Sequence, residues 1–134
     1  MITMLATIFV FGVIVFIHEL GHFVTAKACG MRVDEFAIGF GPAIVKVQKD
    51  ETLYSIRAIP LGGYNKIAGM SDEEELDDRS FLNKPTWQRF IVISAGAVFN
   101  FLLAILIVFS ILVISGAPSP SSEPVIGRMH STGP

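Results

Sequence analysis

The chain has 134 residues, about the length of one ordinary domain; 51% of them are hydrophobic and only 16% are charged. The formal net charge of −2 excludes the basic footprint that nucleic-acid binding needs, so no nucleic acid is expected as a partner. A single cysteine excludes an internal disulfide.

The first long apolar stretch runs from about Ile2 to Ala26. It exceeds the ~18 residues that predict a membrane-spanning helix. We expect this helix within residues 1–29, ended by Gly30. A cleaved signal peptide is excluded on two grounds. No basic residue precedes Lys27, and the stretch is longer than the ~7–15 apolar residues of such peptides.

The pentapeptide HELGH at residues 18–22 lies inside this apolar stretch. Two histidines four residues apart share one helix face, with Cβ atoms ~5–6 Å apart, so both imidazoles can reach one Zn²⁺ at ~2.0–2.1 Å. His18 and His22 are therefore candidate metal ligands, and Glu19 is a candidate general base that takes a proton from water. Ionisable side chains inside an apolar span indicate a functional site by default. The alternative is a buried, mutually hydrogen-bonded His/Glu cluster.

Residues 30–70 are predicted to be mainly extended. Apolar and polar residues alternate at 45–49, and residues 52–57 carry β-branched and aromatic side chains at a period of two. Residues 49–51 fit a hairpin loop, and glycine and proline at 39–42 and 60–64 indicate turns. A phosphate-binding loop is disfavoured, because no Gly-Lys-Ser/Thr follows the glycines. The expected strands are Val33–Ile38, Ala43–Gln48 and Thr52–Ile59.

Residues 71–89 form an acidic run followed by an amphipathic stretch. The run Ser71–Arg79 is predicted to be a solvated loop. In Ser80–Arg89, aromatic and apolar residues such as Trp87 alternate with basic and polar ones, which is typical of a segment at a membrane interface. Pro85 is expected in the first turn of the helix that follows.

The second long apolar stretch, Phe90–Ile114, contains no charged residue and predicts a second span over residues 90–116. Asn100 lies within it and has two interpretations. It is a candidate substrate-binding contact, or it makes a hydrogen bond between helices of the bundle. The tail at 117–134 begins with a stretch rich in proline and serine, which indicates a linker.

The basic residues predict the orientation in the membrane. Nine of the ten lie between Lys27 and Arg89, none precedes the first span and only Arg128 follows the second. The positive-inside rule therefore places residues 27–89 in the cytoplasm and both termini outside. At a rise of ~1.5 Å per residue, His18 lies ~25 Å from the outer end of its helix, so the metal would sit within the bilayer near its cytoplasmic face.

These segments also carry a resemblance to a known family. After HELGH come FAIGFGP at 36–42, IPLGGY at 59–64 with Lys66 and Gly69, Phe81, Lys84, WQR at 87–89, and AG at 95–96 with Asn100. On these motifs, over nearly the whole chain, the sequence resembles the bacterial site-two proteases, which are intramembrane zinc metalloproteases. It resembles in particular the branch that regulates sigma factors by cutting membrane-bound anti-sigma proteins.

The resemblance implies regulated intramembrane proteolysis. It implies a zinc metalloendopeptidase, multi-pass in the inner membrane and surrounded by lipid, whose substrate is a membrane protein such as a single-span anti-sigma factor. The expected fold is an α-helical membrane protein with two transmembrane helices and an intervening cytoplasmic, membrane-re-entrant β-hairpin or sheet. The tail at 117–134 would then hold a linker and the truncated start of an external PDZ domain, with its first strand at 124–128.

The family's third zinc ligand, an aspartate in a Leu-Asp-Gly motif on a later span, has no counterpart here. His130 follows the second span and so lies on the opposite side of the membrane, and Cys29 lies ~10 Å beyond His22 along the helix axis. The chain is therefore expected to be the N-terminal portion of a protease, inactive on its own. The alternative is a non-catalytic membrane module that binds a metal or a partner. A metal-transporter subunit is less favoured, because two spans provide a single cluster of metal-binding side chains.

Overall fold

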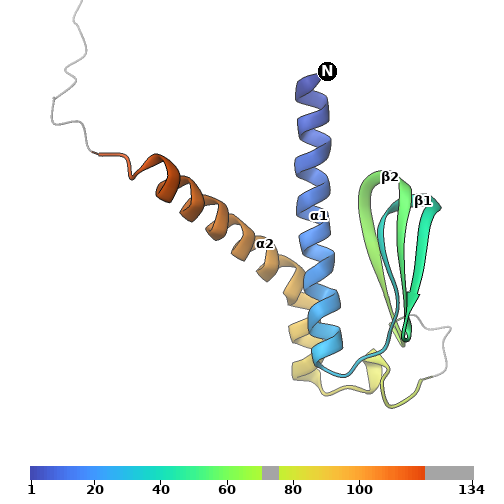
Figure 1. The fold of residues 1–134 in the computed structure, drawn as a ribbon. Coiled ribbons are helices and arrows are strands. Elements are labelled where there is room, and N and C mark those ends of the chain that lie inside the picture. Colours follow the sequence, from blue (N-terminus) through green and yellow to red (C-terminus); the bar gives the residue numbers. More distant parts are fainter. Residues whose placement is uncertain (71–75, 120–134) are drawn as a thin grey trace, which may run out of the picture.

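The computed structural model describes residues 1–70 and 76–119. Along the chain, a small antiparallel sheet of two strands comes between two long helices, which confirms the expected order of elements; in space, the first helix lies between the second helix and the sheet (Figure 1). The elements are α1 (Ile2–Ala28), β1 (Val33–Lys49), β2 (Thr52–Ile67), the short 3-10 helix η1 (Phe81–Asn83) and α2 (Thr86–Ser115). The predictions for residues 71–75 and for the tail from residue 120, including His130 and the start of a PDZ domain, lie outside the described residues.

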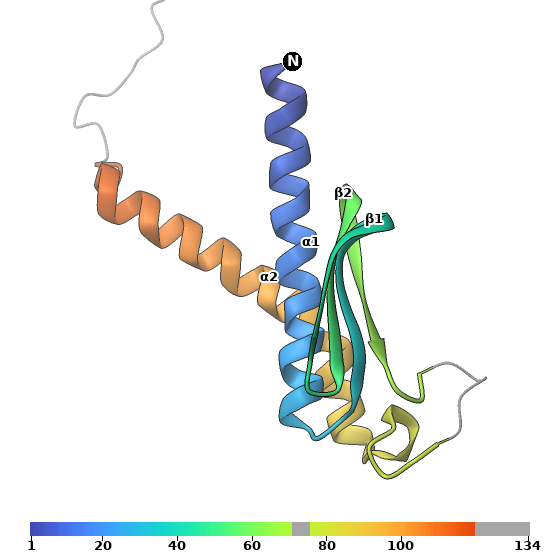
Figure 2. The ribbon, with the colours of Figure 1, turned by 45° about the vertical axis from the view of Figure 1, so that its right-hand side comes forward.

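Helix α1 ends where its glycine predicts. The backbone N–H of Gly30 donates to the carbonyl of Lys27 at 3.1 Å, and that of Met31 donates to the carbonyl of Ala26 at 2.9 Å. These paired bonds form a Schellman motif, and Gly30 adopts the φ of +75° that such a motif requires. The chain reverses there, so β1 runs back beside α1 (Figure 2).

Helix α2 begins at Thr86, four residues before the predicted start, and Pro85 is its N-cap and not a residue of its first turn. The carbonyl of Pro85 accepts hydrogen bonds from the N–H groups of Gln88 and Arg89 at 3.1 and 3.2 Å. The prediction followed hydrophobicity, whereas glutamine and arginine are also good helix formers. Both helices are long and apolar enough to cross a membrane. Their 27 and 30 residues correspond to ~40 and ~45 Å, more than the ~30 Å hydrocarbon layer.

The prediction of three separate strands is wrong, because the structure has two long ones. The hairpin loop between them is confirmed: β1 ends at Lys49 and β2 starts at Thr52. Residues 35–38 of β1 each have two partners in β2, one from residues 63–66 and one from residues 53–56. The first part of β1 is therefore the centre of the sheet, and residues 63–67 of β2 pair on one side only.

The predicted turns at 39–42 and 60–64 are bends within the strands. Gly39, Gly41 and Gly62 have φ values of +86°, +83° and +98°, which only glycine adopts readily. A Cβ on Gly39 would lie 2.5 Å from the carbonyl oxygen of Ile59, so the bend also needs the missing side chain for its close approach. Large apolar side chains are exposed at these bends, among them Phe40, Ile44, Ile59 and Leu61.

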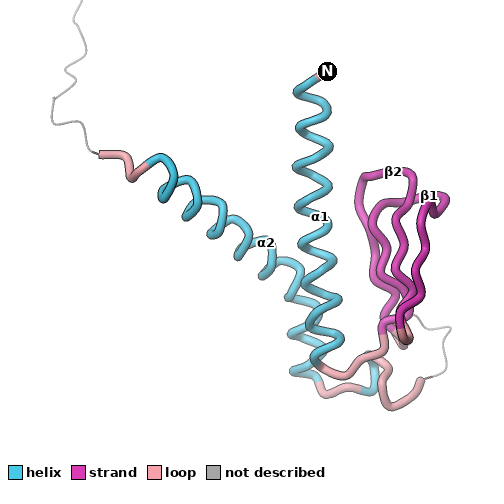
Figure 3. Tube along the Cα trace, in the orientation of Figure 1, coloured by secondary structure: helices cyan, strands magenta, loops and turns pink. Residues whose placement is uncertain are grey.

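The core lies where α1 ends, β1 begins and α2 begins, and the loops between elements gather at that end (Figure 3). Its buried apolar cluster draws one or more residues from each of these elements: Ala26, Met31, Val33, Ile67, Phe81 and Val92. Phe36 of β1 packs against α1 through Phe23, with ring centroids 5.0 Å apart, and Phe16, at 6.2 Å. The sheet is therefore packed along one face of α1.

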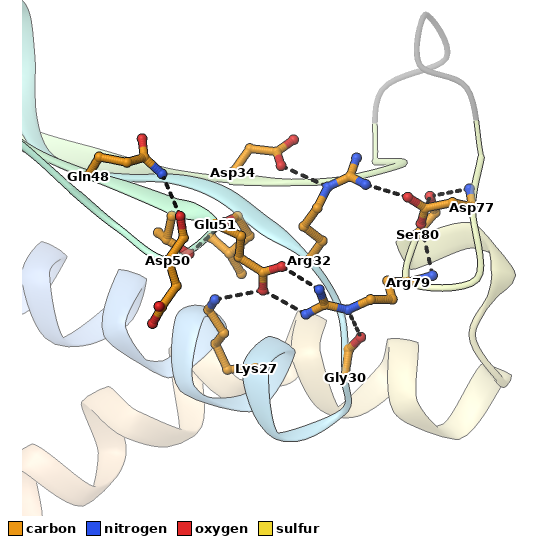
Figure 4. Close-up of polar contacts among 12 residues, drawn as sticks. Lys27, Gly30, Arg32, Asp34, Gln48, Asp50, Glu51, Asp77, Arg79 and Ser80 are labelled. Carbon is orange, nitrogen blue, oxygen red and sulfur yellow. Dashed lines mark hydrogen bonds and ion pairs between the residues drawn. The ribbon is translucent and has the colours of Figure 1, made fainter.

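Charged side chains join the elements at the same end of the molecule (Figure 4). We call Lys27, Arg32, Glu51, Asp77 and Arg79 the basal ion-pair cluster. The carboxylate of Glu51, in the hairpin loop, accepts a hydrogen bond from Lys27 Nζ at 3.0 Å. It also accepts two hydrogen bonds from the Arg79 guanidinium, one of them at 2.6 Å. These hydrogen bonds lower the pKa of Glu51 to about 2, and the contribution from Arg79 is larger than that from Lys27. Arg32 pairs with Asp77, so the cluster fastens the hairpin loop and residues 77–79 to the end of α1.

Candidate metal centre

Helix α1 brings the two motif histidines together, one turn apart. The ring centroids of His18 and His22 are 4.7 Å apart with an interplanar angle of 81°, and their Nε2 atoms are 3.1 Å apart. Two nitrogens bound to one zinc at ~2.0–2.1 Å in tetrahedral geometry would be about 3.3 Å apart. The two imidazoles are therefore already close to the spacing that a shared metal requires.

The second ring nitrogen of His22 is held by helix α2. His22 Nδ1 lies 2.7 Å from the backbone carbonyl oxygen of Val92. A carbonyl oxygen only accepts, so Nδ1 carries a proton, and in the neutral form of the ring the lone pair is then on Nε2, the nitrogen that lies toward His18. Metal-binding histidines commonly have their orientation fixed in this way. No residue type signals this contact in the sequence, because any residue at position 92 supplies a carbonyl.

Two glycines allow α2 to approach the histidines. A Cβ on Gly96 would lie 2.6 Å from His18 Cε1 and 2.6 Å from His22 Nε2. A Cβ on Gly21 would lie 2.6 Å from the carbonyl oxygen of Ala95. Small residues at a crossing let helix backbones come this close. The two rings can thus lie this close to α2 only because position 96 has no side chain, and the paired Nε2 atoms fit a metal held by His18 and His22.

Glu19 projects into a pocket beside the histidine pair. The pocket has a volume of ≈ 350 Å³ and is lined by Glu19, His22, Tyr64, Asn65, Ile67, Met70, Val92 and Ile93. Asn65 Nδ2 donates to Glu19 Oε2 at 2.8 Å and to the Glu19 backbone carbonyl at 2.7 Å. The pocket therefore brings a carboxylate and a histidine from α1 together with an amide from β2. Sequence reasoning did not single out Asn65, which lies 46 residues from Glu19.

Asn100 lies on α2 one turn after Gly96 and is half-buried. Its Oδ1 is buried and has no hydrogen-bond partner within the described residues. Its two interpretations, a contact to a substrate and a bond between helices, both remain predictions.

A third metal ligand is not found in the part of the chain that the structure describes. There, no group of three or more His, Cys, Asp or Glu side chains could hold a metal ion. Cys29 packs against the buried core at the end of α1. Two imidazoles supply half of a tetrahedral shell, so a complete site needs at least one more ligand.

Comparison with known proteins places these residues in a protein family. Residues 6–131 match the family model described as Peptidase family M50. The chain is 44% identical over 131 residues to "Putative zinc metalloprotease FN1322" of Fusobacterium nucleatum, covering 98% of this chain and 38% of that protein. It is 42% identical to a similarly named protein of Clostridium acetobutylicum, covering 95% of this chain and 36% of that one.

The chain is also 36% identical to "Zinc metalloprotease Rip1" of Mycobacterium tuberculosis, covering 90% of this chain and 33% of that protein. It therefore spans less than two fifths of the length of each of these three relatives.

Proposed function

This chain belongs to peptidase family M50, and from that premise we propose that it is the N-terminal catalytic portion of an intramembrane zinc metalloprotease. Membership confirms the resemblance to the site-two proteases that the sequence motifs indicated. The proposed reaction is hydrolysis of a peptide bond in a membrane-embedded segment of another protein.

The observation that carries this proposal is the pair of converging Nε2 atoms of His18 and His22, with Glu19 and His22 lining one pocket. His18 and His22 would hold zinc, with His22 oriented by the Val92 carbonyl. Zinc, when bound, would act as a Lewis acid and make water a better nucleophile near neutral pH. Glu19 would accept a proton from the attacking water on its carboxylate and return it to the nitrogen of the leaving amine. We assign the missing ligand to a residue beyond the described ones.

The distribution of apolar surface supports a position within the bilayer. Both helices are long and apolar enough to span it, and large apolar side chains are exposed along α2 and at the bends of the sheet. We infer that α1 and α2 cross the inner membrane, that residues 27–89 face the cytoplasm, and that the bent end of the sheet dips toward the membrane. The basal ion-pair cluster then lies at the cytoplasmic surface, where charges remain hydrated.

One edge of the sheet offers a means of holding the substrate. A transmembrane helix hides its peptide bonds in its own hydrogen bonds, so it must open before cleavage. Residues 63–67 of β2 have a strand on one side only within the described chain, and Asn65 in this edge contacts Glu19. An opened substrate chain could pair with this edge by β-augmentation, which would satisfy backbone groups that lipid cannot. Asn100 is a further proposed contact to that chain.

A non-catalytic metal- or partner-binding module is the alternative, because the described residues supply only two ligands. Its distinguishing property is that it would bind metal without cleaving anything.

The decisive experiment uses the full-length protein and a membrane-embedded substrate in detergent or lipid. Glu19→Gln should abolish cleavage while leaving the zinc content near wild type, because Glu19 is a base and not a ligand. His18→Ala and His22→Ala should lose both cleavage and zinc. Cleavage by the Glu19→Gln protein at a rate near wild type would remove the general-base assignment, and wild-type protein that binds zinc without cleaving would favour the non-catalytic module.

A further inference from the structure

Asn65 is bound to Glu19 by two hydrogen bonds. Its Nδ2 lies 2.8 Å from Glu19 Oε2 and 2.7 Å from the Glu19 backbone carbonyl oxygen. Both partner atoms are acceptors, so the two N–H groups of the Asn65 amide both donate to Glu19. The Oδ1 atom of Asn65 is buried and has no partner within the described residues. The side chain is thus oriented by its donors and not by its carbonyl oxygen.

The two bonds have different consequences. The bond to the backbone carbonyl fixes Asn65 on α1, whose backbone is rigid, so the amide becomes a firm support. The bond to Oε2 then fixes the end of a glutamate side chain that would otherwise rotate about several single bonds. One carboxylate oxygen is held in this way, and Oε1 receives no bond from Asn65. Asn65 therefore anchors the carboxylate through Oε2 and does not contact Oε1 through a hydrogen bond.

We propose that Asn65 is a positioning residue, which holds Glu19 so that Oε1 faces the attacking water while Oε2 is anchored to β2. The inference rests on the proposed function, in which Glu19 is the general base. The sheet would then have two roles, because the edge that would bind the substrate also orients Glu19. A misplacement of a catalytic group by about 1 Å can cost ~100-fold in rate, so a support of this kind has a measurable effect.

The first test separates rate from binding in the full-length protein. Asn65→Leu, which has a similar size and no donor, should lower kcat about 10- to 100-fold with KM and zinc content within about twofold of wild type. Asn65→Gln, close in volume to leucine but carrying an amide, should recover a several-fold higher kcat than Asn65→Leu. Thr52→Val is the matched control. It removes the 2.7 Å bond from Thr52 Oγ1 to the Val33 carbonyl in the same sheet without touching Glu19, so its kcat should stay within about twofold.

The second test needs no activity. In metal-free full-length protein, the loss in Tm caused by Asn65→Leu should be larger with Glu19 present than in the Glu19→Leu background, where the bond to Oε2 no longer exists. Such non-additivity is the mark of a direct contact. If Asn65 merely fastens β2 to α1, the loss in Tm is the same in both backgrounds.

Three results would overturn the proposal: a kcat of Asn65→Leu within twofold of wild type, an equal kcat for Asn65→Leu and Asn65→Gln, or a loss in Thr52→Val that matches that in Asn65→Leu. Equal losses in Tm in the two backgrounds would also overturn it. Failure of the proposed function is a separate outcome, since Glu19→Gln would then still cleave the substrate or the wild-type protein would not.

Discussion

The helix crossing and the basal ion-pair cluster both hold the molecule together around α1, but they do so by different physics. At the crossing, the backbone of α2 comes so close to α1 that neither Gly21 nor Gly96 has room for a Cβ. In the cluster, the long side chains of Lys27 and Arg79 reach across to Glu51 and are partly exposed to solvent.

The difference decides what each region can control. Steric repulsion rises steeply over tenths of an ångström, so the crossing fixes the histidine rings closely. Exposed ion pairs tolerate shifts of their flexible side chains and are screened by salt. We therefore expect the crossing to set the geometry of the metal centre and the cluster to set only how firmly the hairpin loop is attached.

The largest expected effect is at Gly96. In Gly96→Ala the new Cβ would lie 2.6 Å from both rings, so His18 and His22 must swing apart or His22 must give up its bond to Val92. We predict at least a tenfold loss of bound zinc, together with loss of cleavage. Disturbing the orientation of metal ligands typically lowers metal affinity by about 10- to 100-fold. Metal analysis of the purified full-length protein measures this.

Gly12→Ala is the matched control for that substitution. It makes the same chemical change inside a helix, but its Cβ would meet only the Pro60 carbonyl oxygen at 3.6 Å, an ordinary contact. Its zinc content should equal that of wild type. Stoichiometric zinc in Gly96→Ala would show that the rings can relax and that the close approach of α2 does not set the site.

A smaller effect, measured as a loss of stability, is expected at Gly21. A Cβ there meets the backbone of Ala95 at 2.6 Å, and backbone cannot swing aside as a ring can. Gly21→Ala must separate the helices, which should cost about 1–3 kcal/mol, as overpacking usually does. Unfolding of the full-length protein in detergent, compared with Gly12→Ala, measures this loss. A stability equal to that of Gly12→Ala would mean that the two helices are not held this closely.

The features that could be predicted from the sequence are those that depend on residues close together in the chain. Local spacing predicted the two helices, the shared face of His18 and His22, the glycine end of α1 and a hairpin loop at 49–51, which the structure has at 50–51. The predicted number of strands was wrong, because positive-φ glycines bend each strand and the strand continues beyond the bend, where its pairing resumes with a shifted register. The supports of the site were missed because Val92 and Asn65 lie 70 and 46 residues from their partners. Neither residue type marks a site, and only the fold brings them there.

The smallest expected effect is in the basal ion-pair cluster, and it depends on pH. The pKa of Glu51 is lowered from 4.5 to about 2 in the folded protein, chiefly by Arg79 and then by Lys27. The stabilisation is therefore complete above about pH 4.5 and is lost as the pH falls toward about 2. Taken in full, this shift would correspond to ~3 kcal/mol. The Arg79 side chain is 47% exposed and that of Glu51 27%, however, so solvent screening should reduce the contribution to ~1 kcal/mol or less.

Glu51→Gln should lower the Tm of the full-length protein slightly at pH 7, and the difference from wild type should shrink as the pH falls below about 4.5, where Glu51 itself begins to lose its charge in the unfolded protein. Asp50→Asn is the matched control. It removes one carboxylate from the same loop, while the 3.1 Å bond from Gln48 goes to the Asp50 backbone and is kept. A control that lowers Tm as much as Glu51→Gln would assign the effect to net charge. A difference between Glu51→Gln and wild type that persists unchanged to pH 3 would show that Glu51 does not stabilise the fold through its charge. Zinc content should be unchanged in both variants, because the cluster fastens the hairpin loop and the crossing holds the histidines.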